Sequence, residues 1–357
     1  MNNVKINNVE LGDKNPTFIT FEIGPTHNGV DSAKRLIKHS VDAGADAVKF
    51  QIFDPDKLVA DKKQLFTYEV LVDKETGEKK TIEEPLYDIL KRRSLSIKEW
   101  KEIKAYCDEV GVAFFSTVGF EEDIELLEGI NCDSIKIASA DVNHFPLIRR
   151  AAQTGMTIQL DTGMSTIDEI KKAIVVIEET GNNKIIIHQC PSGYPAYLES
   201  INLNIIPILK KEFNYPIAFS DHSPGWDMNI AAVALGANLI EKTISEDRTY
   251  PSVEHIMSIE PDEMKKFVAS IRDLEVSLGN GIRNIDKEEM DKRDAIRRSV
   301  FTEKLVKKGT LLKDIEVEFR RPGFGIQPDK YELLIAKNSV LINDVEKNTA
   351  IKFSDLE

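Results

Sequence analysis

Two short apolar segments of the chain end in clusters of polar side chains that could do chemistry. Residues 216–219 run directly into Ser220-Asp221-His222, and residues 237–240 run into Glu241-Lys242-Thr243. A buried strand has no structural need for such endings, because moving an unpaired carboxylate, ammonium or imidazole group out of water costs free energy. The two endings therefore indicate either a metal-assisted or acid–base site, or polar caps on two strands.

The segments that must position these groups alternate between apolar runs and amphipathic helical patterns. The runs are rich in β-branched residues and do not alternate with polar ones, which is typical of strands buried on both faces of a parallel sheet. They are residues 18–23, 47–50, 112–115, 134–138, 157–160, 184–188, 217–219 and 239–241. Apolar residues at helical spacing lie between most of them, as in 97–110 and 167–177. Eight such units predict an α/β fold, a (β/α)₈ TIM barrel rather than an open doubly wound sheet.

The pattern of the chain changes near residue 280. We expect residues 1–280 to form the catalytic barrel and residues 281–298 to form a charged, partly helical linker. Short apolar runs in residues 299–357 predict a small, separate β-rich domain. Residues 65–82 interrupt the barrel pattern after the second strand, and they predict a hairpin over the barrel mouth with its turn near Thr76-Gly77.

Composition excludes several classes of protein. The 357-residue chain has 41% hydrophobic residues and a formal net charge of −13, which argues against a nucleic-acid partner. Its three cysteines are too widely spaced for a disulfide framework or a zinc site, and they fit a reducing compartment. No signal peptide and no membrane-spanning apolar run is apparent, so we expect a cytoplasmic protein without a membrane partner.

Two lysines interrupt the predicted strands. Catalytic residues of barrel enzymes gather at the carboxyl ends of strands, where Lys49 and Lys136 are expected to lie. A buried ammonium group is strongly disfavoured unless an anion pairs with it. The two lysines therefore indicate a phosphate or carboxylate site. Alternatively, they pair with carboxylates of the barrel itself, such as Glu22 or Glu241.

The imidazole of His222 has three possible roles: metal ligand, general base or strand cap. We expect Glu22, Asp221 and Glu241 to converge on the same mouth, which makes a metal or acid–base role as plausible as a cap. Just past the eighth strand, either Glu254 or His255 could reach the pocket or remain in solvent.

Seven short motifs resemble, in order, those of the sialic acid synthase family, the phosphoenolpyruvate-dependent synthases of nonulosonic acids such as N-acetylneuraminate, legionaminate and pseudaminate. They are Glu22-Ile23-Gly24 with His27-Asn28-Gly29, residues 43–51, Lys136-Ile137-Ala138-Ser139, Thr162-Gly163-Met164-Ser165, Tyr194-Pro195, Ser220-Asp221-His222 and Leu235-Gly236-Ala237. In the tail, residues 297–299 and 321–325 are similar to the antifreeze-like (SAF) domain of the same enzymes.

The resemblance implies a transferase that adds the methylene carbon of phosphoenolpyruvate to the aldehyde carbon of an N-acylated amino sugar. Water then adds to the enol-ether carbon and phosphate leaves, while a manganese or magnesium ion polarises the aldehyde. Carried over to this chain, phosphoenolpyruvate binds to Lys49, Lys136, Ser139 and Ser220, the sugar contacts Glu22, Gln51 and Tyr194, and His222 is a metal ligand. Glu22, Lys49, Lys136 and His222 are the expected catalytic residues. Family members form domain-swapped homodimers, so Arg321 is expected to contact the acyl group in the partner subunit's site.

The chain departs from the family pattern at four positions, three of which are expected ligand contacts. Thr243 stands where a second metal-binding histidine is usual, and Asp161 where a phosphate-binding serine is usual. Ser192 replaces an asparagine, and Glu254 replaces an aspartate. We expect Asp161, Ser192, Glu254 and Glu241 to line the substrate pocket.

Three hypotheses follow from these departures. The first is a divergent synthase in which Asp161, Glu254 or His255 replaces the missing ligand. The second is a barrel enzyme with another carbonyl acceptor or with lyase chemistry. The third is a non-catalytic sugar-binding homologue, which the retained Lys49, Lys136, Glu22 and His222 argue against.

Overall fold

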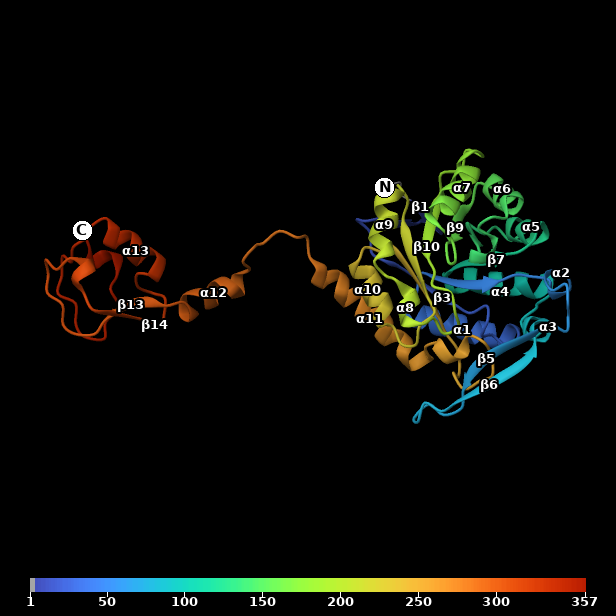
Figure 1. Cartoon of the computed structure of the whole chain (residues 1–357), viewed down its shortest axis with the longest axis horizontal. Coiled ribbons are helices and arrows are strands. Elements are labelled where there is room, and N and C mark those ends of the chain that lie inside the picture. The colour runs from blue at the N-terminus through green and yellow to red at the C-terminus, as the bar shows by residue number, and fades with distance from the viewer. Residues whose placement is uncertain (1–3) are drawn as a thin grey trace. The chain divides into compact units, whose positions relative to one another are not determined.

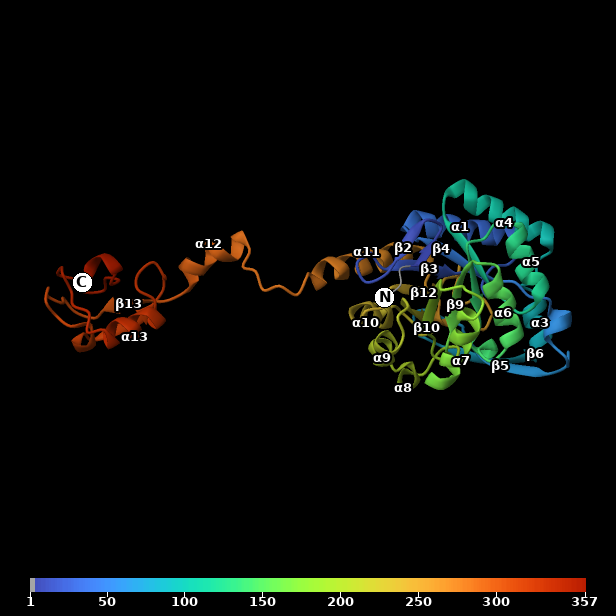
Figure 2. The ribbon, with the colours of Figure 1, turned by 90° about the horizontal axis from the view of Figure 1, so that it is seen from above.

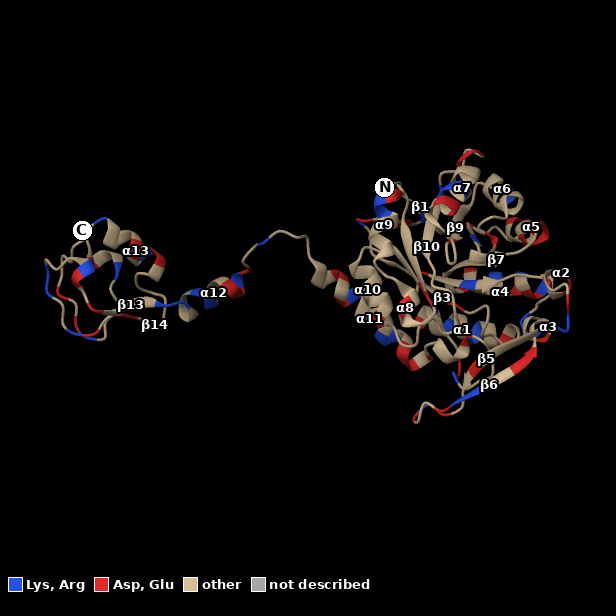
Figure 3. Cartoon of the chain, in the orientation of Figure 1, with Lys and Arg blue, Asp and Glu red and all other residues tan. Residues whose placement is uncertain are grey.

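The computed structural model describes residues 4–357, apart from the side chain of Asp294. The chain divides into two compact units, the first ending at Gly279 and the second beginning at Asn280 (Figure 1). Acidic and basic side chains are interspersed along the helices of the first unit (Figure 3). Among the described residues, no helix is both long and apolar enough to cross a bilayer.

The first unit is a closed barrel of eight parallel strands, which confirms the predicted TIM barrel. Around the barrel the order is β10-β11-β12-β3-β4-β7-β8-β9. The strands are β3 (Phe18–Glu22), β4 (Ala47–Gln51), β7 (Ala113–Val118), β8 (Ser134–Ile137), β9 (Thr157–Asp161), β10 (Ile185–Gln189), β11 (Ile217–Asp221) and β12 (Leu239–Thr243). Each overlaps one of the eight apolar runs, because strands that are buried on both faces are mostly apolar.

Helices surround the strands and bury one apolar face each against them (Figure 2). Ser96 and Thr166 start α4 and α7 with capping boxes, and Gly44 ends α1 in the left-handed region. The ring comprises α1 (Val30–Ala43), α4 (Ile97–Val110), α5 (Glu121–Gly129), α6 (Phe145–Gln153), α7 (Ile167–Glu178), α9 (Ile205–Glu212), α10 (Asp227–Ala234) and α11 (Pro261–Leu278). Shorter turns are α2 (Pro55–Leu58), α3 (Leu86–Lys91), α8 (Leu198–Ile201) and the 3₁₀ helices η1 (Ser139–Asp141) and η2 (His255–Met257).

A short amino-terminal hairpin closes the bottom of the barrel. Its strands β1 (Val4–Ile6) and β2 (Val9–Leu11) pair antiparallel, and they were not predicted. Their side chains Val4, Ile6 and Leu11 form one buried cluster with inward-facing residues of the barrel such as Phe18 and Phe115. The barrel interior is therefore apolar at its amino-terminal end, and its polar residues lie above this layer.

The predicted hairpin after the second barrel strand is confirmed. Strands β5 (Leu65–Leu71) and β6 (Lys79–Pro85) pair antiparallel over seven residues, with the turn near Gly77 as predicted. Tyr68 and Val70 of β5 form a small apolar cluster with Ile89 and Val253. Since Val253 precedes Glu254, this hairpin supports the loop that follows the eighth barrel strand.

The second unit has its own apolar core, built around Val300, Leu312, Ile326, Leu341 and Ile351. It begins with the charged helix α12 (Lys287–Ile296), in the stretch predicted to be a partly helical linker. The strands β13 (Ser299–Thr302) and β14 (Val317–Arg320) pair with each other. Isolated β-bridges, such as Val306 to Val345 and Leu311 to Val340, connect other segments of this unit. The remaining elements are η3 (Leu312–Asp314), α13 (Pro328–Ala336) and η4 (Phe353–Asp355).

Candidate active site

A cavity of about 400 Å³ lies at the carboxyl ends of the barrel strands. Ten of the predicted site residues line it: Glu22, Lys49, Gln51, Ser139, Asp161, Ser192, Tyr194, His222, Glu241 and Glu254. Two more, Lys136 and Ser220, are fully buried beneath the cavity wall, where Lys136 pairs with Asp161 and Ser220 Oγ lies 3.1 Å from Asp161 Oδ1. Arg321 lies in the second unit, where it is exposed after β14. The structure thus brings together twelve side chains that seven different strands and their following loops supply.

Both buried lysines are paired with carboxylates of the cavity. Lys49 forms ion pairs with Glu22 and, at 2.7 Å, with Glu241 Oε1. Lys136 Nζ lies 2.6 Å from Glu241 Oε2 and 3.1 Å from Asp161 Oδ2. Burial favours the neutral form of Glu241, but Lys136 and Lys49 outweigh burial and hold its pKa well below the usual range. The two lysines therefore pair with carboxylates of the barrel, which was the alternative predicted for them.

The cavity contains more acidic than basic side chains. Glu22, Asp161, Glu241 and Glu254 all line it, against Lys49 at the wall and Lys136 beneath it. An anionic ligand must therefore displace carboxylates from the two ammonium groups or enter together with a cation, because two adjacent anions repel each other.

His222 presents one ring nitrogen as a potential metal ligand. Its Nδ1 lies 3.0 Å from the carbonyl oxygen of Pro191, and a carbonyl only accepts, so Nδ1 carries the proton. Nε2 is then the nitrogen with a free lone pair in the neutral ring, which is the usual arrangement of a metal-binding histidine. The ring of Tyr194 lies beside it, with the two centroids 4.7 Å apart.

Thr243, in the position of the missing histidine, holds a carboxylate instead. Its hydroxyl donates to Glu254 Oε2 at 3.1 Å, and Glu254 is buried in the cavity wall. Burial raises the pKa of the Glu254 carboxyl, while His222 and Lys49 oppose that rise. A buried carboxylate close to a free imidazole lone pair is a suitable place for a divalent cation.

The donor set for such a cation is small. Between residues 4 and 357, no group of three or more histidine, cysteine, aspartate or glutamate side chains is arranged to hold a metal ion. His222 and Glu254 could supply two ligands, an imidazole nitrogen and a carboxylate oxygen, to a divalent cation. Substrate oxygens and water would complete the coordination, as in sites where Mg²⁺ keeps several waters.

Two residues that were expected at the mouth lie elsewhere. Asp221 accepts from Lys242 at 2.9 Å and from the Ser223 hydroxyl at 2.6 Å, behind the barrel wall. Its predicted convergence with Glu22 and Glu241 is wrong, because successive side chains of a strand face opposite ways and Ser220 faces inward. His255 is buried beside Tyr250 and does not line the cavity, so it is not the replacement ligand.

The buried Asp221–Lys242 pair is expected to hold the ends of β11 and β12 in place. Both side chains are fully buried. Removing one partner of such a pair leaves an uncompensated charge, so Lys242→Met should lower the free energy of unfolding by about 3–5 kcal/mol. Denaturant unfolding of the barrel would measure this. The double variant Asp221→Leu/Lys242→Met should regain part of the loss, and equal loss in both variants would contradict this explanation.

Several site residues were not predicted. Phe66, Thr117, Met164 and Cys190 also line the cavity. Beneath it, His188 and Gln159 are fully buried and bond to each other. The signal that could have found Gln159 is its position between Ile158 and Leu160, since a polar residue inside a doubly buried strand must face a polar barrel interior.

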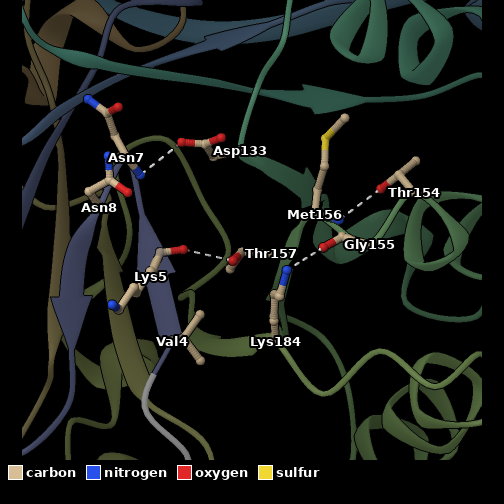
Figure 4. Close-up of a pocket in the computed structure, with 10 residues that line it drawn as sticks. All are labelled: Val4, Lys5, Asn7, Asn8, Asp133, Thr154, Gly155, Met156, Thr157 and Lys184. Carbon is tan, nitrogen blue, oxygen red and sulfur yellow. Dashed lines mark hydrogen bonds between the residues drawn. The ribbon is translucent and has the colours of Figure 1, made fainter.

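Another cavity, of about 470 Å³, lies at the amino-terminal end of the barrel between β1 and β9. Its polar groups already bond to one another (Figure 4): the Asn7 amide donates to Asp133, and Lys184 donates to the Gly155 carbonyl. It contains no histidine, and its one carboxylate is occupied. The cavity at the carboxyl ends of the strands is therefore the candidate active site.

Known proteins share both the sequence and this architecture. Residues 36–283 match the model of the NeuB family. N,N'-diacetyllegionaminic acid synthase of Campylobacter jejuni is 32% identical over 90% of this chain and 95% of its own. An uncharacterized protein of Methanocaldococcus jannaschii is 36% identical over 100% and 99%. The N-acetylneuraminic acid synthetase of Leptospira borgpetersenii, crystallised with citrate, has a TM-score of 0.70 at 28% identity over 83% of this chain and 97% of its own. The chain with this cavity belongs to the NeuB family.

Proposed function

We propose that the protein condenses phosphoenolpyruvate with the aldehyde carbon of an N-acylated amino sugar, forming a nonulosonic acid and releasing phosphate. The observation that carries the proposal is the convergence of Lys49, Lys136 and His222 on one cavity in a chain of the NeuB family. Relatives that cover nearly the whole chain are named as synthases of legionaminic and pseudaminic acids. Both names describe an enzyme that makes a sugar acid.

The donor would bind at the floor of the cavity. Lys136 and Lys49 are the cations that lie there, and Ser139 stands at the rim of the floor, where its Oγ accepts from the Gly163 amide at 3.0 Å. The phosphate and carboxylate groups of phosphoenolpyruvate would take over part of the contacts that Glu241 and Asp161 now make with the lysines. This exchange keeps each ammonium group paired, which is what burial requires.

A divalent cation, manganese or magnesium, would be held by His222 Nε2 and Glu254. When bound, it would polarise the aldehyde oxygen of the acceptor and so favour attack by the methylene carbon. Its positive charge also offsets the excess of carboxylates in the cavity. Both ligands belong to the mouth, above the lysines, so the acceptor aldehyde and the donor would meet between them.

The acceptor would contact Glu22, Gln51, Ser192 and Tyr194 around the mouth. Although 43% of Tyr194 is exposed, loss of water around its hydroxyl in the cavity, together with Glu254, raises the pKa of the phenol, which therefore stays protonated and can donate to a sugar oxygen. Glu22, paired with Lys49, offers a carboxylate that can take the proton from the attacking water. Arg321 would reach the acyl group from a partner subunit in a domain-swapped homodimer, through a second unit of the SAF type.

A phosphate-release assay with oxygen labelling is the direct test. The protein is incubated with phosphoenolpyruvate, Mn²⁺ or Mg²⁺, and a panel of N-acylated hexosamines in H₂¹⁸O. Phosphate should appear only when an acceptor is present. It should carry no label, because C–O cleavage leaves all phosphate oxygens in place, and one ¹⁸O should enter the sugar acid.

The outcomes separate the competing hypotheses. Release without an acceptor, or label in the phosphate, would contradict the proposed reaction and indicate other chemistry in the same barrel. Binding of a sugar with neither phosphoenolpyruvate binding nor phosphate release would identify a non-catalytic homologue. Chelation of the divalent cation should stop release, and full activity in a chelator would exclude its proposed role.

A further inference from the structure

A chain of hydrogen bonds runs from Lys136 down into the barrel. Lys136 Nζ donates to Ser220 Oγ at 3.0 Å, and Ser220 Oγ lies 3.0 Å from His188 Nδ1. His188 Nε2 lies 2.9 Å from Gln159 Oε1. Every one of these four side chains is almost completely buried, so water cannot take the place of a missing partner.

The far end of this chain fixes the tautomer of His188. Ser134 Oγ donates to the carbonyl of Thr157 at 3.0 Å, so it must accept from the Gln159 amide nitrogen at 2.9 Å. The Gln159 carbonyl oxygen therefore faces His188, and an amide oxygen only accepts. His188 Nε2 must carry a proton, which leaves Nδ1 as an acceptor when the ring is neutral.

The neutral ring is the form that the surroundings favour. Burial, and then the positive charge of Lys136, lower the pKa of His188 to about 3 despite the opposing charges of Asp161 and Glu241. Nδ1 thus needs a donor, and among the described residues Ser220 supplies the one hydrogen bond to it.

The single hydroxyl hydrogen of Ser220 has two possible acceptors, of which His188 Nδ1 is the first. Asp161 Oδ1 lies 3.1 Å from Ser220 Oγ and could also accept it. However, Asp161 keeps its ion pair with Lys136 and borders the open cavity, whereas His188 has no access to solvent. Leaving a buried acceptor without a partner is the more expensive arrangement. Ser220 therefore donates to His188 and turns a lone pair toward Lys136.

We propose that His188 and Gln159 are positioning residues for Lys136, because they hold the Ser220 hydroxyl as a hydrogen-bond acceptor for the ammonium group. One N–H of Lys136 is thereby fixed downward, and the other two point at Glu241 and Asp161, which border the cavity. Ser220 itself does not donate to a ligand. The inference rests on the proposed function in one respect, namely that Lys136 binds the anionic donor.

Two measurements on the full-length protein test this inference. The first is ¹⁵N NMR of histidine-labelled protein, in which His188 should show a protonated Nε2 and a bare Nδ1 between pH 6 and pH 8, a range chosen around the ordinary histidine pKa of about 6.5. The second is calorimetry with phosphoenolpyruvate. In His188→Leu the dissociation constant should rise by about 10-fold or more, while KM for the sugar stays unchanged.

Matched variants distinguish positioning from general damage. In His188→Asn the side-chain oxygen can replace Nδ1 as the acceptor, so affinity for phosphoenolpyruvate should return close to that of the unaltered protein. His27→Leu removes an equally buried imidazole that packs on Phe50 and Trp100, away from the chain of hydrogen bonds, and should leave this affinity unchanged. Thermal unfolding confirms that each variant is folded.

A protonated Nδ1 in the NMR spectrum would overturn the inference, and so would unchanged phosphoenolpyruvate affinity in folded His188→Leu. Should His188→Leu fail to fold, Gln159→Leu replaces it, with the same expected loss. If the unaltered protein binds no phosphoenolpyruvate, the proposed function is wrong. The tautomer of His188 would still show whether the proposed chain of hydrogen bonds exists.

Discussion

Replacing Lys136 with methionine is expected to abolish turnover and to weaken phosphoenolpyruvate binding by roughly 30-fold to 5,000-fold, the equivalent of about 2–5 kcal/mol. The reason is twofold. The variant loses a buried cation of the proposed donor site, and it leaves Asp161 without the ammonium group that now lies 3.1 Å away. Glu241 keeps only Lys49 as a cationic partner. The remaining carboxylates would then repel the incoming anion.

Calorimetry with phosphoenolpyruvate in the presence of Mn²⁺ measures this loss. Lys242→Met is the matched control, because it removes an equally buried lysine that directly follows Glu241 on β12 and pairs with Asp221, away from the cavity. That control should lose stability and keep its affinity for the donor. A folded Lys136→Met protein that binds phosphoenolpyruvate as tightly as the unaltered protein would refute the role given to Lys136.

Replacing Glu254 with glutamine is expected to weaken Mn²⁺ binding by at least about 100-fold, because loss of a ligand should exceed the 10-fold to 100-fold effects seen for residues that only orient ligands. The glutamine keeps the size of the side chain and removes the charge. Thr243→Val, which removes the hydroxyl that donates to Glu254 at 3.1 Å, should have a smaller effect of about 10-fold.

Electron paramagnetic resonance of free Mn²⁺ measures both affinities without reference to turnover. Glu275→Gln serves as the control, because this carboxylate bonds to the Thr17 amide and to Arg272 at the opposite end of the barrel. Unchanged Mn²⁺ affinity in Glu254→Gln would show that the second ligand lies elsewhere. Asp161 would then be the remaining carboxylate to test among the proposed replacements.

The barrel could be predicted from the sequence because its signal is local. Each of the eight strands is a short apolar run, and such a run can be recognised in the sequence without knowledge of its tertiary contacts. The polar residues at the strand ends, such as Lys49 and His222, could be predicted for the same reason. Since parallel strands of a barrel end at one face, their convergence follows from topology alone.

The direction of each side chain could not be predicted in the same way. Ser220 and Asp221 are neighbours in sequence, yet one faces the barrel interior and the other the helices. Choosing between them requires the pairing register, and a shift of one residue exchanges the two faces. The error at Asp221 has this origin.

Partners distant in sequence were equally out of reach. Thr243 looked like the loss of a ligand, whereas its hydroxyl supports Glu254 eleven positions further along the chain. The three-residue strands β1 and β2 are too short to give a period, so the hairpin that they form left no signal. His188 and Gln159 became visible only once their strands were placed side by side.

The amino-terminal hairpin has a kinetic consequence. Val4, Ile6 and Leu11 close the bottom of the barrel with an apolar layer, so we expect both substrates to enter the cavity from the carboxyl ends of the strands. A donor seated at the floor, against Lys136, must then arrive before an acceptor that occupies the mouth. We therefore expect steady-state kinetics of a compulsory order, in which excess acceptor inhibits by blocking the path of phosphoenolpyruvate.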